Sequence, residues 1–114
     1  MDKSVTQTVT IAAGASLSGA STKYPGYRLV AVETASTWDA AKLTFMVSSD
    51  GVNFLDLTEA GTEYETASIT GAEAIALDGS LFILWDYVKV RSGTSAAAVN
   101  QADATVITLG LYRL

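Results

Sequence analysis

Apolar and polar residues alternate most clearly between positions 38 and 57, where the sequence reads WDAAKLTFMVSSDGVNFLDL. Leu43, Phe45 and Val47 share one face of an extended chain, because successive side chains of a strand point to opposite sides. An Asp-Gly pair then provides a tight turn, since glycine adopts positive φ without steric cost. The pattern predicts a β-hairpin, with a return strand over residues 52–57, at the centre of an all-β domain.

The same period of two recurs along the rest of the chain, and no stretch carries an apolar stripe of helical period and length. Residues 81–85 form a dense apolar run, which predicts a short helical turn or a loop that plugs one end of a sandwich. Seven or eight short strands about ten residues apart predict a single domain over residues 1–114, an antiparallel β-sandwich or jelly roll. The other expected strands cover residues 5–11, 28–33, 64–67, 74–77, 87–91 and 104–114.

The polar segment 1–22 leaves two alternatives open. Its apolar residues alternate with Thr, Ser and Gln, which favours a first strand followed by a loop or frayed edge. Its composition also suits a flexible arm that orders only on assembly. The first residues lack the apolar core of a secretory signal, so we expect synthesis in the cytoplasm. No apolar run reaches the length of a membrane helix, so we expect no membrane partner.

Composition narrows the chemistry further. The chain has no cysteine and no histidine, which removes disulfides, thiolate metal sites and the commonest general base. The formal net charge is −5, and the seven Lys and Arg residues are scattered. Because no basic stripe is available to follow a phosphate backbone, we expect no nucleic-acid partner. We also expect no enzymatic activity and no cofactor.

Three sets of residues could nevertheless carry chemistry. The carboxylates Asp50 and Asp56 could serve a glycosidase or, with Asn53, bind calcium, but acidic residues at a turn on an acidic protein are more often simply solvated. The hydroxyls of residues 92–95 have no histidine to activate them. Several aromatic side chains could stack on sugar rings if they were exposed together, although the tryptophans fit a core or interface better. These aromatic residues are Trp38, Trp85, Tyr24, Tyr27, Tyr64, Tyr87 and Tyr112.

A fourth set fits a protein interface. Lys89 and Arg91 share one face of a predicted strand, and a loop of small and amide residues follows at positions 92–102. Small side chains allow two backbones to approach, and Tyr and Arg are frequent interface anchors. The alternative is a solvated strand face beside an ordinary loop. The candidate assembly residues are Tyr87, Lys89, Arg91, Ser92, Gly93, Thr94, Asn100, Gln101, Tyr112 and Arg113.

Two motifs together carry a resemblance to a known group of proteins. One is W-D-A-A-x-L-T-F-x-x-S-x-D-G-x-x-F at residues 38–54, and the other is V-K-V-R-S-G-T-S-A-A-A-V-N-Q at residues 88–101. The chain resembles, over residues 27–114, small proteins encoded among the structural genes of tailed bacteriophages. Ala98 stands where a proline is expected in that group.

The resemblance implies a structural component of a virion, made in the host cytoplasm. Among such roles, a capsid decoration (cement) protein fits the chain length best, and a head fibre, neck or tail component is the alternative. The expected partner is the major capsid protein, and the expected oligomer is a trimer on the capsid surface. A second hypothesis is a carbohydrate-binding module or fibre component that recognises host surface glycans, which would need aromatic side chains exposed in a row.

Overall fold

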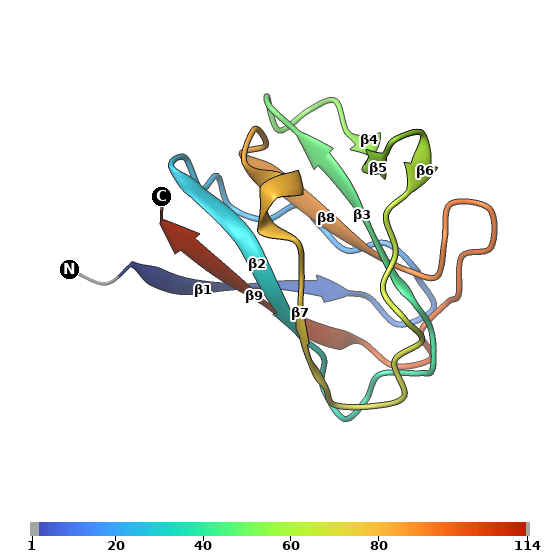
Figure 1. Cartoon of the computed structure of the whole chain (residues 1–114). Helices are drawn as coiled ribbons and strands as arrows, with labels where there is room; N and C mark the ends of the chain where they lie inside the picture. Colours follow the sequence, from blue (N-terminus) through green and yellow to red (C-terminus); the bar gives the residue numbers. More distant parts are fainter. Residues whose placement is uncertain (1–2, 114) are drawn as a thin grey trace.

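The computed structural model describes residues 3–113, which form a β-sandwich with one short 3₁₀-helix (Figure 1). The prediction of an all-β domain is confirmed. The elements are β1 (Ser4–Ile11), β2 (Tyr27–Glu33), β3 (Leu43–Ser48), β4 (Leu55–Asp56), β5 (Thr58–Glu59), β6 (Thr62–Glu63), β7 (Ala74–Ala76), η1 (Gly79–Phe82), β8 (Tyr87–Ser92) and β9 (Thr105–Arg113).

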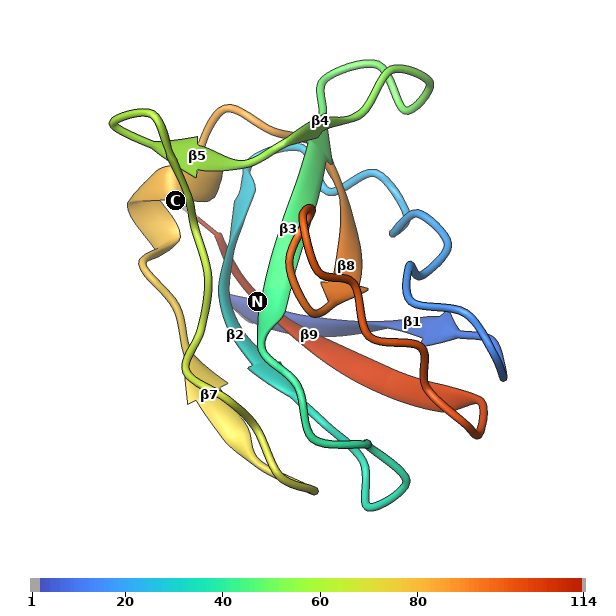
Figure 2. The same ribbon diagram turned by 90° about the vertical axis from the view of Figure 1, so that its right-hand side faces the viewer.

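Two antiparallel sheets make the sandwich. The larger sheet has the strand order β1-β9-β2-β7, and the smaller one has the order β4-β3-β8. Strands β5 and β6 form a separate two-stranded hairpin. The two sheets face one another, with the connection after β7 and η1 closing one side (Figures 1 and 2). None of the helical structure in residues 3–113 has the length and hydrophobicity that crossing a bilayer requires.

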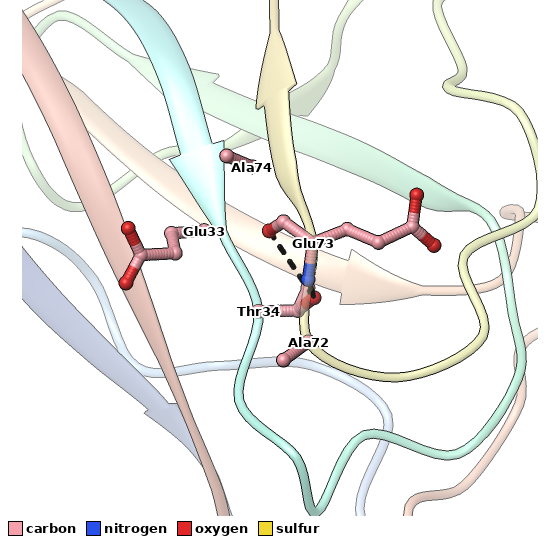
Figure 3. Close-up of a pocket in the computed structure, with 5 residues that line it drawn as sticks. All are labelled: Glu33, Thr34, Ala72, Glu73 and Ala74. Carbon is pink, nitrogen blue, oxygen red and sulfur yellow. Dashed lines mark hydrogen bonds between the residues drawn. The ribbon is translucent and has the colours of Figure 1, made fainter.

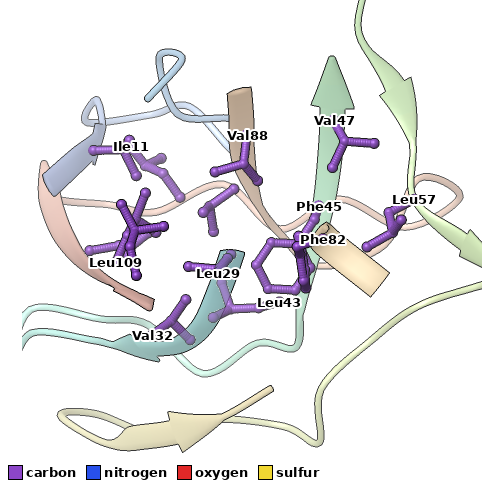
Figure 4. Packing of buried hydrophobic residues seen from close by; sticks show 14 of the residues in the cluster. Ile11, Leu29, Val32, Leu43, Phe45, Val47, Leu57, Phe82, Val88 and Leu109 are labelled. Carbon is purple, nitrogen blue, oxygen red and sulfur yellow. The ribbon is translucent and has the colours of Figure 1, made fainter. Parts of the chain in front are cut away.

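The core lies between the sheets and is built by the period-two pattern (Figure 4). On β3 and β8, alternate side chains point inward, and Phe45, Val88 and Val90 are fully buried. On β9 the inward positions are Ile107, Leu109 and Leu111, which are also buried. Each sheet is thus apolar on its inner face, which is the condition for two sheets to pack together.

The predicted hairpin is present, but its return strand is much shorter than expected. Only Leu55–Asp56 pairs with β3. The Asp50 carboxylate accepts hydrogen bonds from the backbone N–H groups of Val52 and Asn53, at 2.8 Å each. These bonds wind the chain into a local turn that keeps it away from the β3 ladder.

The connection after β4 also differs from expectation. In the segment 64–67 that is predicted as a strand, only Glu65 pairs, in an isolated bridge with Thr44 of β3, and just before this segment lies the β5–β6 hairpin. Its turn residues Ala60 and Gly61 both have positive φ, 51° and 84°. Two consecutive positive φ values match the twist of a tight hairpin, which explains why the strands lie on either side of this pair.

The apolar run 81–85 lies at the end of η1 and partly plugs the sandwich, as predicted. Asp78 caps η1 by accepting a hydrogen bond from the Ser80 N–H. Phe82 is fully buried and its ring meets that of Phe45 edge to face, with 5.3 Å between centroids. The neighbouring Leu84 remains largely exposed, so the plug is incomplete.

The N-terminal segment belongs to the sandwich. Eight residues of β1 pair with β9, from Ser4 opposite Tyr112 to Ile11 opposite Thr105. An arm ordered only on assembly does not fit these contacts, because the sheet itself orders the strand. Residues 1–2 of the predicted arm lie outside the described residues.

Residues 16–24 run along the free edge of β8. The N–H groups of Ser18 and Ser21 donate to the Val90 and Val88 carbonyls, each at 2.9 Å. In return the two serine hydroxyls accept from the N–H groups of the same two valines, at 2.9 and 3.0 Å. The serine side chains thereby replace the carbonyls of a regular strand partner and seal this edge.

Candidate functional site

The ten residues predicted as an assembly surface do not form one surface. Four of them are buried, four are half-buried, and only Asn100 and Tyr112 are exposed. The buried residues are Arg91, Ser92, Gly93 and Gln101, and the half-buried residues are Tyr87, Lys89, Thr94 and Arg113.

Arg91 is the centre of a buried ionic network. Its guanidinium lies 2.6 Å from the Asp56 carboxylate and 3.0 Å from that of Glu63. The guanidinium also donates to the Thr44 hydroxyl at 3.4 Å. Glu63 in turn accepts from the Ser95 N–H. Arg91 therefore connects β8 to β4, to β6 and to the loop that follows β8. Only 9% of its surface is exposed, so it offers little area to a partner.

Gln101 is the centre of a second internal network and is fully buried. Its side-chain oxygen accepts from the Asp39 N–H at 2.7 Å, and its amide nitrogen donates to the Asp39 carbonyl at 3.1 Å. The same nitrogen donates to the Ser92 hydroxyl at 2.8 Å. The Gln101 amide thus makes the hydrogen bonds that a neighbouring strand would otherwise make with the Asp39 backbone. Because its donor and acceptor groups are already paired, it is not available to another subunit.

Position 93 requires glycine, because of its backbone conformation and because the chain packs closely against it. Its φ is +88°, and a Cβ atom there would lie 2.5 Å from the Ala97 carbonyl oxygen. The small residues of the 93–99 loop therefore let the loop fold back on itself, rather than on a second chain.

Tyr87 and Lys89 hold the turn after β3. The Tyr87 ring lies against Gly51, where an added Cβ would come within 2.9 Å of the ring. The Lys89 ammonium lies 4.5 Å from the centroid of the Phe54 ring, a cation–π contact. Hydrogen bonds from the Asn53 and Val52 backbone hold the pKa of the Asp50 carboxyl well below its usual range.

A groove lined mainly by apolar side chains lies at one end of the sandwich. We call it the end groove, and its volume is about 320 Å³. Leu55 on its wall is 70% exposed. Apolar side chains and three polar residues line it: Val47, Leu55, Leu57, Leu81 and Trp85, with Asp56, Thr58 and Ser80.

Three segments position the end groove. Leu55 lies on the short strand β4, directly opposite Val47 of β3. Leu81 is carried by η1, and the Trp85 N–H donates to the Phe82 carbonyl at the end of that helix. Because η1 stops here, Leu84 beside Trp85 is also left 79% exposed. The dense apolar run at 81–85 was the sequence signal for this site, whereas nothing in the pattern separated exposed Leu55 from buried Leu57.

A second depression lies at the junction of β2 and β7 and holds two acidic residues (Figure 3). Its volume is about 250 Å³. The side chains of Glu33 and Glu73 point to opposite sides, so they do not form a carboxylate pair (Figure 3). The Thr34 hydroxyl donates to the Gly71 carbonyl at 2.6 Å and accepts from the Glu73 N–H at 3.0 Å. These polar groups satisfy one another and hold the β2–β7 junction together.

The other residues that were candidates for catalysis or ligand binding make structural contacts within the domain. Asp50 is occupied by its turn and Asp56 by Arg91. Among residues 3–113, no three acidic side chains cluster as a metal site. Trp38 is buried and donates its indole N–H to the Ile69 carbonyl. Burial, with a smaller contribution from the Asp86 charge, raises the pKa of Tyr24 well above its usual range.

The aromatic residues do not form an exposed row. Of the large hydrophobic side chains that the structure shows as exposed, Tyr112 is the one aromatic. Trp85 is half-buried and lines the end groove, whereas Tyr112 does not line it. A sugar platform of several aromatic rings is therefore absent from the described part of the chain.

No family model and no curated protein matches this chain. Three kinds of solved structure show a distant likeness. A mitogen derived from Yersinia pseudotuberculosis is 10% identical, covering 100% of this chain and 88% of its own, with a TM-score of 0.42. A family 89 glycoside hydrolase of Clostridium perfringens is 13% identical, with a TM-score of 0.37; the match covers 90% of this chain but 14% of the hydrolase. The structure of tomato aspermy virus is 13% identical, with coverage of 100% and 80% and a TM-score of 0.35. At such TM-scores these likenesses carry no functional assignment.

Proposed function

We propose that this chain is a structural protein of a bacteriophage virion, a capsid decoration protein that binds the assembled head. The observation that carries the proposal is the end groove, where Leu55 leaves apolar surface uncovered, together with the exposed Leu84 next to Trp85 in the sequence. A further support is the resemblance of residues 38–54 and 88–101 to tailed-phage structural proteins. Exposed apolar side chains around a concave site are typical of protein contacts.

The partner is the major capsid protein, and the chemistry of the groove defines what it presents. An apolar side chain of the shell fills the space between Leu55 and Trp85, which removes both from water. Burying a leucine that is largely exposed contributes roughly 1–2 kcal/mol per site. The chain carries a net charge of −5, so basic residues around that side chain assist the encounter.

Decoration of this kind stabilises a shell through the number of its contacts. A specific protein contact of standard size buries on the order of 1,600 Å². When each bound copy bridges neighbouring capsid subunits, the shell resists the pressure of packaged DNA without covalent chemistry. Binding to the shell alone, with no turnover, is the expected behaviour.

Immunogold labelling of purified particles tests the location, and co-sedimentation with shells that lack the protein tests the groove. Label over the whole head supports decoration, whereas label at the tail tip or fibres contradicts it. We expect Leu55→Asp to lose at least about tenfold in shell affinity. The control is Val106→Asp, which charges another exposed apolar position on β9. Unchanged binding of the Leu55 variant would exclude the groove.

Recognition of a host glycan is a second candidate, favoured by one feature of the same groove. Trp85 lies beside Asp56, Thr58 and Ser80, a combination of a ring face and polar groups that suits a sugar. Calorimetric titration with surface glycans of the host tests it. Binding that disappears in Trp85→Ala but persists in Tyr112→Ala would support a sugar site. No heat at millimolar sugar would exclude it.

A further inference from the structure

The edge strands of the two sheets differ in how well their outward backbone groups are protected from pairing with another chain. The β8 edge is sealed by residues 16–24, as described above. Strand β7 has three residues and β4 has two, and short edge strands offer little for another chain to pair with. Strand β1 forms the remaining edge of the larger sheet and is eight residues long.

The backbone alternation shows which groups of β1 face outward. The Arg113 N–H donates to the Lys3 carbonyl, so these opposed residues form a hydrogen-bonded pair with β9. In an antiparallel ladder such pairs alternate with pairs that point their N–H and C=O groups away from each other. Ser4, Thr6 and Thr8 therefore direct their backbone groups to the free edge.

Those outward groups are open at the start of the strand. Within residues 3–113, no hydrogen bond reaches the outward N–H or C=O of Ser4, Thr6 or Thr8. Nearer the end of β1, the Gly19 N–H approaches the Thr10 carbonyl at 3.4 Å. The accessible part of the edge is therefore centred on residues 4–6.

This part of the edge also carries none of the devices that discourage pairing. Residues 4–11 contain no charge, no proline and no glycine, and the ladder with β9 has no bulge. Val5 lies between the two open residues and is 38% exposed, although it points to the inner face of the sheet. A partner strand would bury it.

We propose that the β1 edge pairs with the β1 edge of a second copy of this chain, antiparallel about a twofold axis at Val5. In this register Val5 faces Val5, and Ser4 of each copy faces Thr6 of the other. Four backbone hydrogen bonds form, and the larger sheets of the two copies become one continuous sheet. Lys3 then faces the neutral Gln7 of the second copy, so the seam brings no like charges together despite the net charge of −5.

A second copy suits this edge better than an unrelated strand, because the sequence around Val5 is complementary to itself. Small hydroxyl side chains flank the valine on both sides, so the antiparallel copy places hydroxyl opposite hydroxyl and valine opposite valine. Cross-strand pairs of these kinds are favourable. The pairing is twofold, unlike the trimer that the sequence resemblance implies, and it needs no capsid, so it is independent of the proposed function.

Sedimentation velocity over micromolar to millimolar concentration provides the first test. We expect a monomer–dimer equilibrium that Thr6→Pro weakens at least about tenfold, because it removes two symmetric hydrogen bonds. The Thr6 N–H points away from β9, so proline there leaves the ladder intact. The control is Thr6→Ala, which changes the side chain but keeps the N–H and should retain the dimer. A chain that stays monomeric, or that forms a trimer unaffected by Thr6→Pro, overturns the proposal.

Cross-linking tests the register and does not depend on the proline variant folding. The chain has no cysteine, so a single one can be placed at will. Opposed residues of a non-hydrogen-bonded pair have Cα atoms about 4.5 Å apart, within disulfide range. We expect Val5→Cys to give a disulfide-linked dimer under mild oxidation, and Val106→Cys, an equally exposed valine on β9, to give far less. Equal yields from the two variants would overturn the pairing about Val5.

Discussion

At both ends of β8, the polarity of the residues and their exposure to water are opposite to what is usual. At the end of the strand and in the loop after it, the polar residues Arg91, Ser92 and Gln101 are buried. Before the strand, residues 81–85 are apolar, yet Leu84 is almost fully exposed and Trp85 lines a groove. Arg91, Ser92 and Gln101 therefore offer almost no surface to a partner, whereas the apolar end exposes Leu84.

The difference shows what buried polar groups do in a domain with few regular connections. Long excursions such as residues 92–104 leave backbone groups without a ladder partner, and burying them unpaired would destabilise the fold. Gln101 provides such partners to the Asp39 N–H and C=O, and Arg91 pairs with the carboxylates of Asp56 and Glu63, so the two side chains connect several segments. The apolar end needs no such support, because η1 satisfies its own backbone and leaves apolar side chains at its end.

Replacing Gln101 should produce a large effect on folding. Gln101→Leu preserves the size of the side chain but leaves the Asp39 N–H and C=O and the Ser92 hydroxyl without this partner. We expect a loss of about 3 kcal/mol in the free energy of unfolding, measured by urea denaturation. The matched control, Asn100→Leu, changes an exposed amide and should stay within about 0.5 kcal/mol. Similar losses for the two would mean that the buried amide has no special role.

Replacing Arg91 should weaken folding before it affects any assembly, contrary to what a surface arginine would do. Arg91→Met leaves Asp56 and Glu63 without their cation in a partly buried setting. We expect a loss of about 2 kcal/mol, below the value for a fully buried pair because the Asp56 side chain is 38% exposed. Lys89→Met, on the same strand face, should lose about 0.5 kcal/mol. Thermal and urea unfolding of both variants provide the measurement; equal stability of the arginine variant and the parent would contradict this role.

Polar substitutions at Leu55 and Leu57 sharpen the description of the apolar end. Leu55→Ser should change the free energy of unfolding by no more than about 0.5 kcal/mol, because the side chain already contacts water. Leu57→Ser should lose about 3 kcal/mol, because that side chain belongs to the core. Urea denaturation separates the two. If Leu55→Ser were as damaging as Leu57→Ser, the groove would be part of the core and not a docking surface.

Acid should weaken the turn that Asp50 stabilises, and we expect this change in stability to be the smallest of those predicted. The folded pKa of Asp50 is lowered, so its contribution to stability is present above the ordinary aspartate value near pH 4 and is lost as the pH falls from there toward the folded pKa. The difference in melting temperature between the parent and Asp50→Asn should therefore shrink between about pH 6 and about pH 2. Comparing the two proteins removes the titration of other carboxyls. A difference independent of pH would show that the ionised carboxylate does not stabilise the turn.

Local pattern alone determined the strands and the core. The alternation in residues 43–48, 87–91 and 104–113 predicts β3, β8 and β9 and their buried faces, because period two follows from backbone geometry and not from context. The Asp50-Gly51 turn was predictable for the same reason. The shortening of the return strand was not, since the Asp50 carboxylate competes with the ladder for the Val52 and Asn53 N–H groups.

Only the tertiary structure decided which polar and apolar residues are exposed. Arg91 lies on the face of β8 that the pattern marks as polar, but the β4–β6 excursion covers that face and brings Asp56 and Glu63 to it. Leu55 and Leu57 are the same residue type two positions apart, yet Leu57 belongs to the core and Leu55 is 70% exposed. Whether a side chain meets water depends on segments distant in sequence, and no local period encodes where those segments pass.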